Sequence, residues 1–158
     1  MDPYAQFNEN LKFAADAFKN IDKKEIIRVV SHIDADGISA CALLLKLLNN
    51  ESRKYSVSIV QQLNRHLLLQ LAKEPYNCFI FTDIGSGVIN DVSEVLNGKK
   101  VFILDHHSIS ADNPEQIAKD IVFVNPHLYG IDGGKEISGA GVVFKFACTV
   151  DSSMEDFA

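Results

Sequence analysis

Histidine and aspartate residues that could bind a metal ion gather in three short stretches of the chain. They are His32, Asp34 and Asp36 in "SHIDADG", Asp83 in "FTDIGSG", and Asp105, His106 and His107 in "LDHH". Carboxylates and imidazoles without a thiolate suit manganese or magnesium, and zinc less selectively. So many anionic groups repel one another unless cations lie between them. If these residues meet in space, they predict two divalent metal ions that share a carboxylate, the arrangement that catalyses phosphoryl transfer.

Whether they meet depends on the elements that carry them. Each stretch follows a run of apolar residues that is typical of a buried strand: "IIRVV", "CFIF" and "VFIL". In a parallel sheet, ligands bind beyond the carboxyl ends of the strands, so three such ends converge on one place. Each acid also has a local alternative. Asp36 could cap a helix, Asp83 could belong to a turn beside Gly85 and Gly87, and Asp105 could end a strand. The convergence of three strand ends favours the shared site.

Apolar periodicity predicts strands that alternate with helices along the chain. The strands are expected at 25–31, 55–63, 77–83, 99–107 and 121–125, and the helices at 3–20, 37–49, 65–74, 88–97 and 138–150, with a helical turn at 113–120. Asp2 followed by Pro3 marks the start of the first helix. This alternation predicts an α/β fold of Rossmann type, with a parallel sheet of about five strands and helices on both faces.

Composition bounds the class of protein. The 158 residues are 47% hydrophobic and 23% charged, as in an ordinary globular protein of one domain. The net charge of −6 gives no global case for nucleic-acid binding, but carboxylates that hold metal ions count as negative in that sum. We expect no membrane contact, because no apolar run is long enough to span one. Cys41, Cys78 and Cys148 form no C-x-x-C pair, and they favour a cytoplasmic protein with reduced thiols.

The motifs resemble those of a known family. "SHIDADG", "FTDIGSG", "LDHH" and "GGKEISGAGVVFKFA", in this order, are similar to the DHH phosphoesterase superfamily over about residues 25–148. Within it they look closest to the archaeal RecJ-like proteins, which include a nuclease associated with the GINS replication complex. The resemblance implies a metal-dependent exonuclease of DNA replication and repair that acts on single-stranded DNA or RNA. Its cofactors would be two divalent ions, most often manganese, with magnesium possible.

The resemblance also implies a role for each polar residue. His32 and Asp34 would hold the first metal ion, Asp36 and His106 would hold the second, and Asp83 would bridge the two. Asp105 would orient a neighbouring imidazole, and His107 would face the scissile phosphate as a hydrogen-bond donor.

The chain departs from the family in one respect. Family members supply a further aspartate ligand beyond the "GAGVVFKFA" helix, together with a C-terminal substrate-binding domain. Here "TVDSSMEDFA" contains Asp151 and Asp156, and neither has the glycine-flanked context of that motif. We therefore expect residues 1–158 to form the N-terminal catalytic subdomain alone, with an incomplete second metal site.

The glycine-rich segment 130–141 leaves two interpretations open. Its backbone amides and side chains, at Ser138, Gly139 and Gly141, could bind a nucleic-acid phosphate at the start of a helix. Equally, the segment could be a loop that leads into a capped, tightly packed helix. His66 and His127 lie off the predicted strand ends and are expected to be surface or structural residues.

Three functions remain open from the sequence. The first is the exonuclease, and the second is a non-catalytic RecJ-like replication scaffold, which the intact ligand set disfavours. The third is a small-molecule phosphoesterase that cleaves pyrophosphate, cyclic dinucleotides or short oligonucleotides. Expected partners are single-stranded DNA or RNA and GINS-type replication proteins.

Overall fold

In the part of the chain that the structure describes, five parallel strands form one sheet in the order β2-β1-β3-β4-β5. The computed structural model of the chain describes residues 2–110 and 121–157. The strands are β1 (Ile26–His32), β2 (Lys54–Val60), β3 (Cys78–Thr82), β4 (Lys100–Leu104) and β5 (Ile121–Val124). The predicted α/β class and the parallel sheet of about five strands are confirmed.

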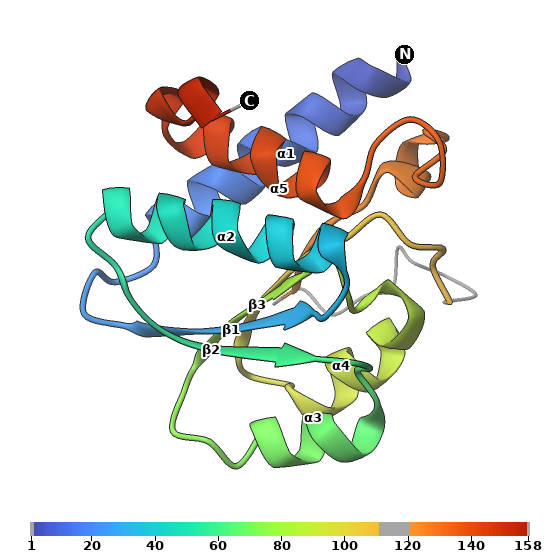
Figure 1. The fold of residues 1–158 in the computed structure, drawn as a ribbon. Coiled ribbons are helices and arrows are strands. Elements are labelled where there is room, and N and C mark those ends of the chain that lie inside the picture. The colour runs from blue at the N-terminus through green and yellow to red at the C-terminus, as the bar shows by residue number, and fades with distance from the viewer. Residues whose placement is uncertain (1, 111–120, 158) are drawn as a thin grey trace.

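Helices cover both faces of this sheet (Figure 1). They are α1 (Pro3–Lys19), α2 (Ala35–Asn50), α3 (Arg65–Leu71), α4 (Ile89–Val95) and α5 (Gly139–Val150), with short 3₁₀ turns at η1 (Ser86–Val88), η3 (Pro126–Tyr129) and η4 (Ser152–Phe157). Helices α1, α2 and α5 pack on one face, and α3 and α4 pack on the other. Among the described residues, no helix has the length and apolar character needed to cross a membrane.

The strand sequences are nearly continuous in apolar residues because both faces of the sheet are covered. All five residues of β3 are buried. On the first face, α1 contributes Phe7, Leu11 and Phe18 to the core. The Phe18 ring packs edge-on against Phe102 of β4 and Phe146 of α5, with centroid distances of 6.5 and 5.7 Å. The N-terminal helix is therefore part of the hydrophobic core.

Several predicted boundaries move by a few residues. The strand expected at 99–107 ends at Leu104, and the strand expected at 55–63 ends at Val60. The helix expected at 37–49 begins at Ala35, because the Asp34 carboxylate accepts a hydrogen bond from Gly37 N at 2.8 Å and caps it. Asp36 thus lies in the first turn and is not the cap. The helix expected at 88–97 divides into η1 and α4, and the turn expected at 113–120 lies outside the described residues.

The direction in which the chain winds along the sheet reverses between β1 and β3. The chain leaves β1 into α2 on one face of the sheet, and it leaves β3 into α4 on the opposite face (Figure 1). Ligands of such doubly wound sheets bind at this divergence, outside the carboxyl ends of the strands. The "SHIDADG" and "FTDIGSG" stretches both begin there.

Candidate metal centre

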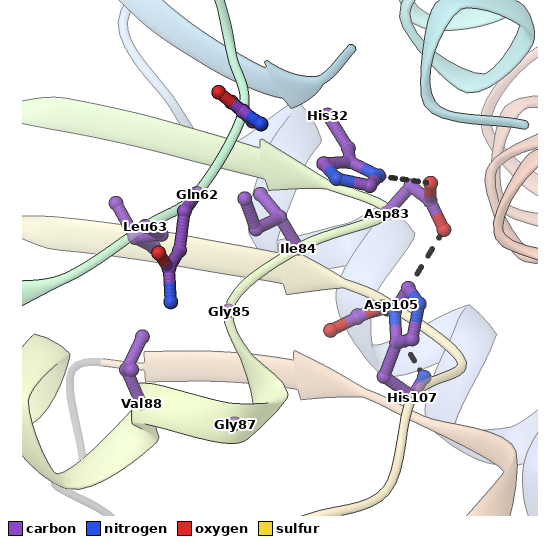
Figure 2. A pocket seen from close by; sticks show the side chains of 11 residues that line it. His32, Gln62, Leu63, Asp83, Ile84, Gly85, Gly87, Val88, Asp105 and His107 are labelled. Carbon is purple, nitrogen blue, oxygen red and sulfur yellow. Dashed lines mark hydrogen bonds and ion pairs between the residues drawn. The ribbon is translucent and has the colours of Figure 1, made fainter. Parts of the chain in front are cut away.

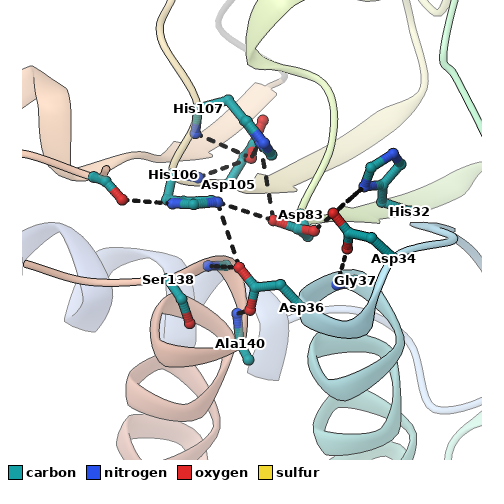
Figure 3. A network of polar contacts seen from close by, with 12 residues as sticks. His32, Asp34, Asp36, Gly37, Asp83, Asp105, His106, His107, Ser138 and Ala140 are labelled. Carbon is teal, nitrogen blue, oxygen red and sulfur yellow. Dashed lines mark hydrogen bonds and ion pairs between the residues drawn. The ribbon is translucent and has the colours of Figure 1, made fainter. Parts of the chain in front are cut away.

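The structure brings together all seven polar residues of the three stretches. They come from the ends of β1, β3 and β4 and from the start of α2, and their side chains point toward one another (Figure 3). Asp83 lies at the centre, and its carboxylate faces three imidazoles. The structure therefore gives the convergence that the strand ends predict, while the metal-binding roles of these residues remain predictions.

The first group of potential ligands consists of His32, Asp34 and Asp83. One ligand atom from each lies within 4.8 Å of the other two. His32 Nδ1 is 3.0 Å from Asp34 Oδ2 and 3.7 Å from Asp83 Oδ2. This nitrogen is buried and has no hydrogen-bond partner among the described residues. The lone pair of His32 Nδ1 is therefore available to a cation in the neutral ring.

The second group consists of Asp83, His106 and His107, whose ligand atoms also lie within 4.8 Å of one another. His106 Nε2 is 3.2 Å from Asp83 Oδ1 and 3.4 Å from Asp36 Oδ2. His106 Nδ1 lies 2.6 Å from the Gly133 carbonyl oxygen, so Nδ1 carries the hydrogen and donates it. A backbone carbonyl on one ring nitrogen fixes the tautomer in which the other nitrogen can bind a metal.

Asp83 belongs to both groups, and its surroundings would be stabilised by a bound cation. It is only 1% exposed, and neither carboxylate oxygen receives a hydrogen bond from a described residue. Burial raises the pKa of Asp83, as expected for a desolvated carboxylate. Its neighbours are mostly other acceptors, namely carboxylate oxygens and imidazole nitrogens. Hard divalent ions such as manganese or magnesium bind such a set, so the residues present fit the predicted cofactor.

Asp36 has a second bonding role that the sequence did not reveal. Its Oδ2 accepts a hydrogen bond from Gly139 N and its Oδ1 accepts one from Ala140 N, both at 2.8 Å. The carboxylate therefore bonds the first two amides of α5 while it also lies beside His106, and it links the first turn of α2 to the first turn of α5 (Figure 3). Any ion at this position would share the Asp36 oxygens with two backbone amides.

Asp105 holds His107, as the predicted orienting role requires. The Asp105 Oδ1 atom accepts a hydrogen bond from His107 Nδ1 at 2.7 Å, and Oδ2 accepts one from Ser86 N at 2.9 Å. Burial works to raise the pKa of Asp105, but these bonds outweigh it and hold the pKa at about 2. The His107 side chain is half exposed, so its second nitrogen can reach a substrate.

The sequence analysis did not identify the residues that hold Asp105 and His107 in place. Asn125, which is completely buried, donates from Nδ2 to Ser86 Oγ at 2.8 Å and to the His107 carbonyl oxygen at 2.9 Å. Ser86 in turn donates its backbone N–H to Asp105. A signal was present, because Asn125 follows β5 just as the acids follow β1, β3 and β4.

The predicted phosphate-binding residues Ser138, Gly139 and Gly141 lie at the start of α5. Ser138 Oγ accepts a hydrogen bond from Gly141 N at 3.2 Å and caps the helix, while the Gly139 amide is bonded to Asp36. A Cβ atom on Gly139 would lie 2.1 Å from Asp83 Oδ1, so only glycine lets α5 approach this carboxylate. The open alternative of a tightly packed, capped helix thus has direct structural support, and phosphate binding remains a prediction.

Three residues that had no assigned role are also placed. His66 is exposed on α3, as expected. His127 instead lines a pocket of about 190 Å³ together with His106 and His107, so it is closer to the centre than its position after β5 suggested. Asp151 ends α5 and bonds to Asn50 and Ser153, at the opposite end of the helix from Gly139. In this arrangement it therefore cannot act as the further aspartate ligand that the resemblance implies.

Comparison with known proteins identifies relatives of the chain. Residues 26–157 match the model of the DHH family, N-terminal domain. An uncharacterized protein of Methanocaldococcus jannaschii, MJ0831, is 35% identical over 124 residues, which are 77% of this chain and 28% of that protein. The single-stranded-DNA-specific exonuclease RecJ of Bacillus subtilis is 26% identical over 98% of this chain and 20% of its own length.

A solved structure shows the same fold. RecJ of Thermus thermophilus in complex with Mn²⁺ superposes with a TM-score of 0.70 at 23% identity, over 92% of this chain and 21% of that one. The chain thus spans about a quarter of the length of the relatives it matches. The family match covers both the sheet and the polar residues at its carboxyl edge, and the chain belongs to the DHH family, of which it contains the N-terminal domain.

Proposed function

We propose that this domain is the catalytic part of a metal-dependent phosphodiesterase, and that its reaction is exonucleolytic cleavage of single-stranded DNA or RNA. The observation that carries the proposal is Asp83, a buried carboxylate that two groups of potential ligands share and that accepts no hydrogen bond from the described residues. The family supports a phosphoesterase, and the printed function of the RecJ relative supports the nuclease.

The cofactors of the proposed reaction are two divalent ions, with manganese favoured because a RecJ structure was solved with it. His32 and Asp34 would hold one ion, Asp36 and His106 would hold the other, and Asp83 would contact both. When bound, such a pair of ions neutralises phosphate charge and makes water a stronger nucleophile.

The chain's own residues position the substrate for this chemistry. Asp105 accepts the Nδ1 hydrogen of His107 and so directs Nε2 toward the open side of the centre. The hydrogen bond to Asp105 raises the pKa of His107, which favours the protonated ring. Protonated His107 donates from Nε2 to a non-bridging phosphate oxygen, where negative charge develops in the transition state.

The other candidate functions make different demands on the same residues. A non-catalytic scaffold has no need for seven polar residues held together at the carboxyl edge of the sheet, and this argues for an enzyme. A small-molecule phosphoesterase would use the same ions, and it differs in what binds beside them. A GINS-type partner, a role in replication and a cytoplasmic location are part of the proposal and rest on the RecJ-like resemblance and the unpaired cysteines.

Calorimetric titration of metal-stripped chain with manganese tests the proposal. We expect micromolar or tighter affinity, and we expect Asp34→Ala to weaken it strongly. Labelled single-stranded DNA, single-stranded RNA and pyrophosphate, offered to the same preparations, then rank the substrates. A folded chain that takes up no manganese would exclude the enzyme, and preferential cleavage of pyrophosphate would replace the nuclease by a small-molecule phosphoesterase.

A further inference from the structure

A pocket of about 340 Å³ lies directly beside the candidate metal centre. His32, Asp83, Asp105 and His107 form its inner side, where the rings of His32 and His107 lie 6.5 Å apart between centroids. Figure 2 shows these residues on one side of the pocket and Gln62, Leu63 and Val88 on the other. A ligand in this pocket would therefore touch the residues that face the scissile phosphate.

Two loops form the outer wall of the pocket. The loop after β2 contributes Gln61, Gln62 and Leu63, and the segment after β3 contributes Ile84 and, from the 3₁₀ turn η1, Val88. Ile84 and Val88, which are partly exposed, give the wall an apolar surface, and the buried Leu63 lies behind it. The glutamine side chains are exposed, and neither makes a hydrogen bond among residues 2–110 and 121–157. The wall thus offers apolar contact together with free amide donors and acceptors.

The apolar wall and the amide side chains favour some phosphoesterase ligands over others. A nucleobase has flat apolar faces and an edge of hydrogen-bond donors and acceptors, which side-chain amides can pair with. A polyphosphate chain needs cations along its length, and none of the described residues that line the pocket is Lys or Arg. The volume lies at the small end of the range for small-molecule sites, about 300–1,000 Å³, which suits one nucleoside.

We propose that this pocket, which we call the Gln62 pocket, binds the nucleoside next to the scissile phosphate. The inference rests on the proposed function, because it places the phosphate at the metal centre and the base against Leu63, Ile84 and Val88. Gln62, with Gln61 beside it, then contacts the edge of the base. The pocket makes the chain selective for nucleotide phosphodiesters over inorganic phosphate esters and anhydrides.

The test compares two ligands of the manganese-loaded chain by competition calorimetry: 2′-deoxythymidine 5′-monophosphate and inorganic phosphate. Both place a phosphate at the centre, and only the nucleotide fills the pocket. A base that removes about 60 Å² of apolar surface from water should make the nucleotide bind about tenfold more tightly.

Two variants assign that preference to the pocket. Val88→Trp fills the pocket and should abolish the preference while phosphate affinity stays within about twofold. Gln62→Ala should reduce the preference about threefold or more, because it removes the amide without adding bulk. Its matched control is Gln70→Ala, the same substitution at an exposed position on α3 that lies outside the pocket.

The outcomes separate this inference from the proposed function. The proposed role of the Gln62 pocket is wrong if nucleotide and phosphate bind equally, or if Val88→Trp and Gln62→Ala both leave the preference intact. Neither result contradicts the proposed metal-dependent enzyme. Failure of both ligands to bind the manganese-loaded chain overturns the proposed function and the pocket with it. If Val88→Trp does not fold, as judged by circular dichroism, Gln62→Ala against Gln70→Ala decides alone.

Discussion

At the scale of single residues, Asp83 combines features that destabilise a fold with features that suit a cofactor. Its carboxylate is buried and accepts no hydrogen bond from residues 2–110 or 121–157. Its backbone adopts φ 57, in the left-handed region that few residues other than glycine occupy. Such strain collects at functional sites because the surrounding structure can hold it in place. Burial of an unpaired charge costs stability that a bound cation would restore.

Because of this conflict, we expect Asp83→Asn to stabilise the metal-free protein and to weaken metal binding. Asparagine tolerates the left-handed backbone, and its amide can donate to the ring nitrogens that face Asp83. We expect the free energy of unfolding of the metal-free variant to be about 1–2 kcal/mol higher than that of the wild type. Manganese affinity should fall further than in Asp36→Ala or His106→Ala, because both groups lose a ligand. Urea unfolding and calorimetry measure the two quantities, with the exposed Asp16→Asn as the charge-matched control. Lower stability of metal-free Asp83→Asn would contradict the account.

His107 tests whether a residue near the predicted metal positions is also a ligand. Its Nδ1 is already bonded to Asp105, although its ligand atoms lie close to those of Asp83 and His106. We expect His107→Ala to change manganese affinity by less than about threefold and to reduce nuclease turnover roughly 10²–10³-fold, the loss of one transition-state donor. The comparison is His106→Ala, which should weaken manganese binding. Equal loss of manganese in both variants would make His107 a ligand.

The sequence predicted which residue types meet at the site, and it did not predict their partners. His32, Asp83 and His106 could be found because ligand-type residues followed apolar strands. The hydrogen bond from His106 to Gly133 and the network through Asn125 join segments that are distant in sequence. Only the packed fold brings those segments together, so no local pattern could reveal the contacts.

At the scale of elements, the close approach of α5 to β3 determines the geometry of the centre. Asp36 bonds to the first two amides of α5, and Gly139 leaves no room for a side chain beside Asp83. Similarly, a Cβ atom on Gly37 would lie 2.4 Å from the His32 carbonyl oxygen. The glycines of both motifs thus allow a helix to start directly against a strand end.

Gly139→Ala should therefore damage the site although alanine favours helices. The added methyl group would force Asp83 or the start of α5 to shift, at a cost of about 1–3 kcal/mol. We expect lower thermal stability and at least tenfold weaker manganese binding. Gly87→Ala is the control, because a Cβ atom there has no neighbour within 4 Å. Calorimetry of both variants measures the difference. Unchanged manganese affinity in Gly139→Ala would show that the contact with Asp83 is not required.

Element identities were predictable, but their ends were less so. The fold class was predicted from apolar strands that alternate with amphipathic helices, and the structure has the same alternation. The strand expected at 99–107 ends at Leu104, and beyond it Asp105 N still bonds to Val124 O at 3.1 Å. Where pairing stops depends on the neighbouring strand, and the sequence of one strand does not contain that information.

At the scale of the whole molecule, the candidate metal centre joins parts of the chain that are far apart in sequence. The potential ligands come from β1, the start of α2, and the segments that follow β3 and β4. The unfolded chain cannot hold these residues in place, so manganese should bind the folded state far better than the unfolded state. Metal binding then adds directly to the stability of the fold.

We expect manganese at 100 times its dissociation constant to add about 2.7 kcal/mol to the free energy of unfolding. For a chain of this length, that corresponds to a rise in Tm of roughly 5–11 °C. Differential scanning calorimetry with and without manganese measures the shift. Asp34→Ala should show a much smaller rise at the same manganese concentration. A wild-type Tm that does not respond to manganese would contradict a centre assembled by the fold.

The two predicted metal positions should not be equivalent. His32 Nδ1 and the Asp83 oxygens have no other hydrogen bonds among the described residues, whereas both Asp36 oxygens already accept amide hydrogens from α5. Asp151, at the far end of α5, cannot add a ligand beside His106. We expect the second ion to bind at least tenfold more weakly than the first, the size of effect expected when supporting contacts of a metal ligand are imperfect.

Manganese titration followed by electron paramagnetic resonance should therefore resolve a tight and a weak site. Asp34→Ala should weaken the tight site, and Asp36→Ala should weaken only the other. Since the proposed two-metal reaction would require both ions, we expect cleavage of single-stranded oligonucleotides by this chain to be slow and to rise with manganese across the range of the weaker site. Two sites of equal affinity, or cleavage that saturates once the tight site is filled, would contradict this prediction. Either result would show that the hydrogen bonds from the α5 amides to Asp36 do not weaken its binding to an ion.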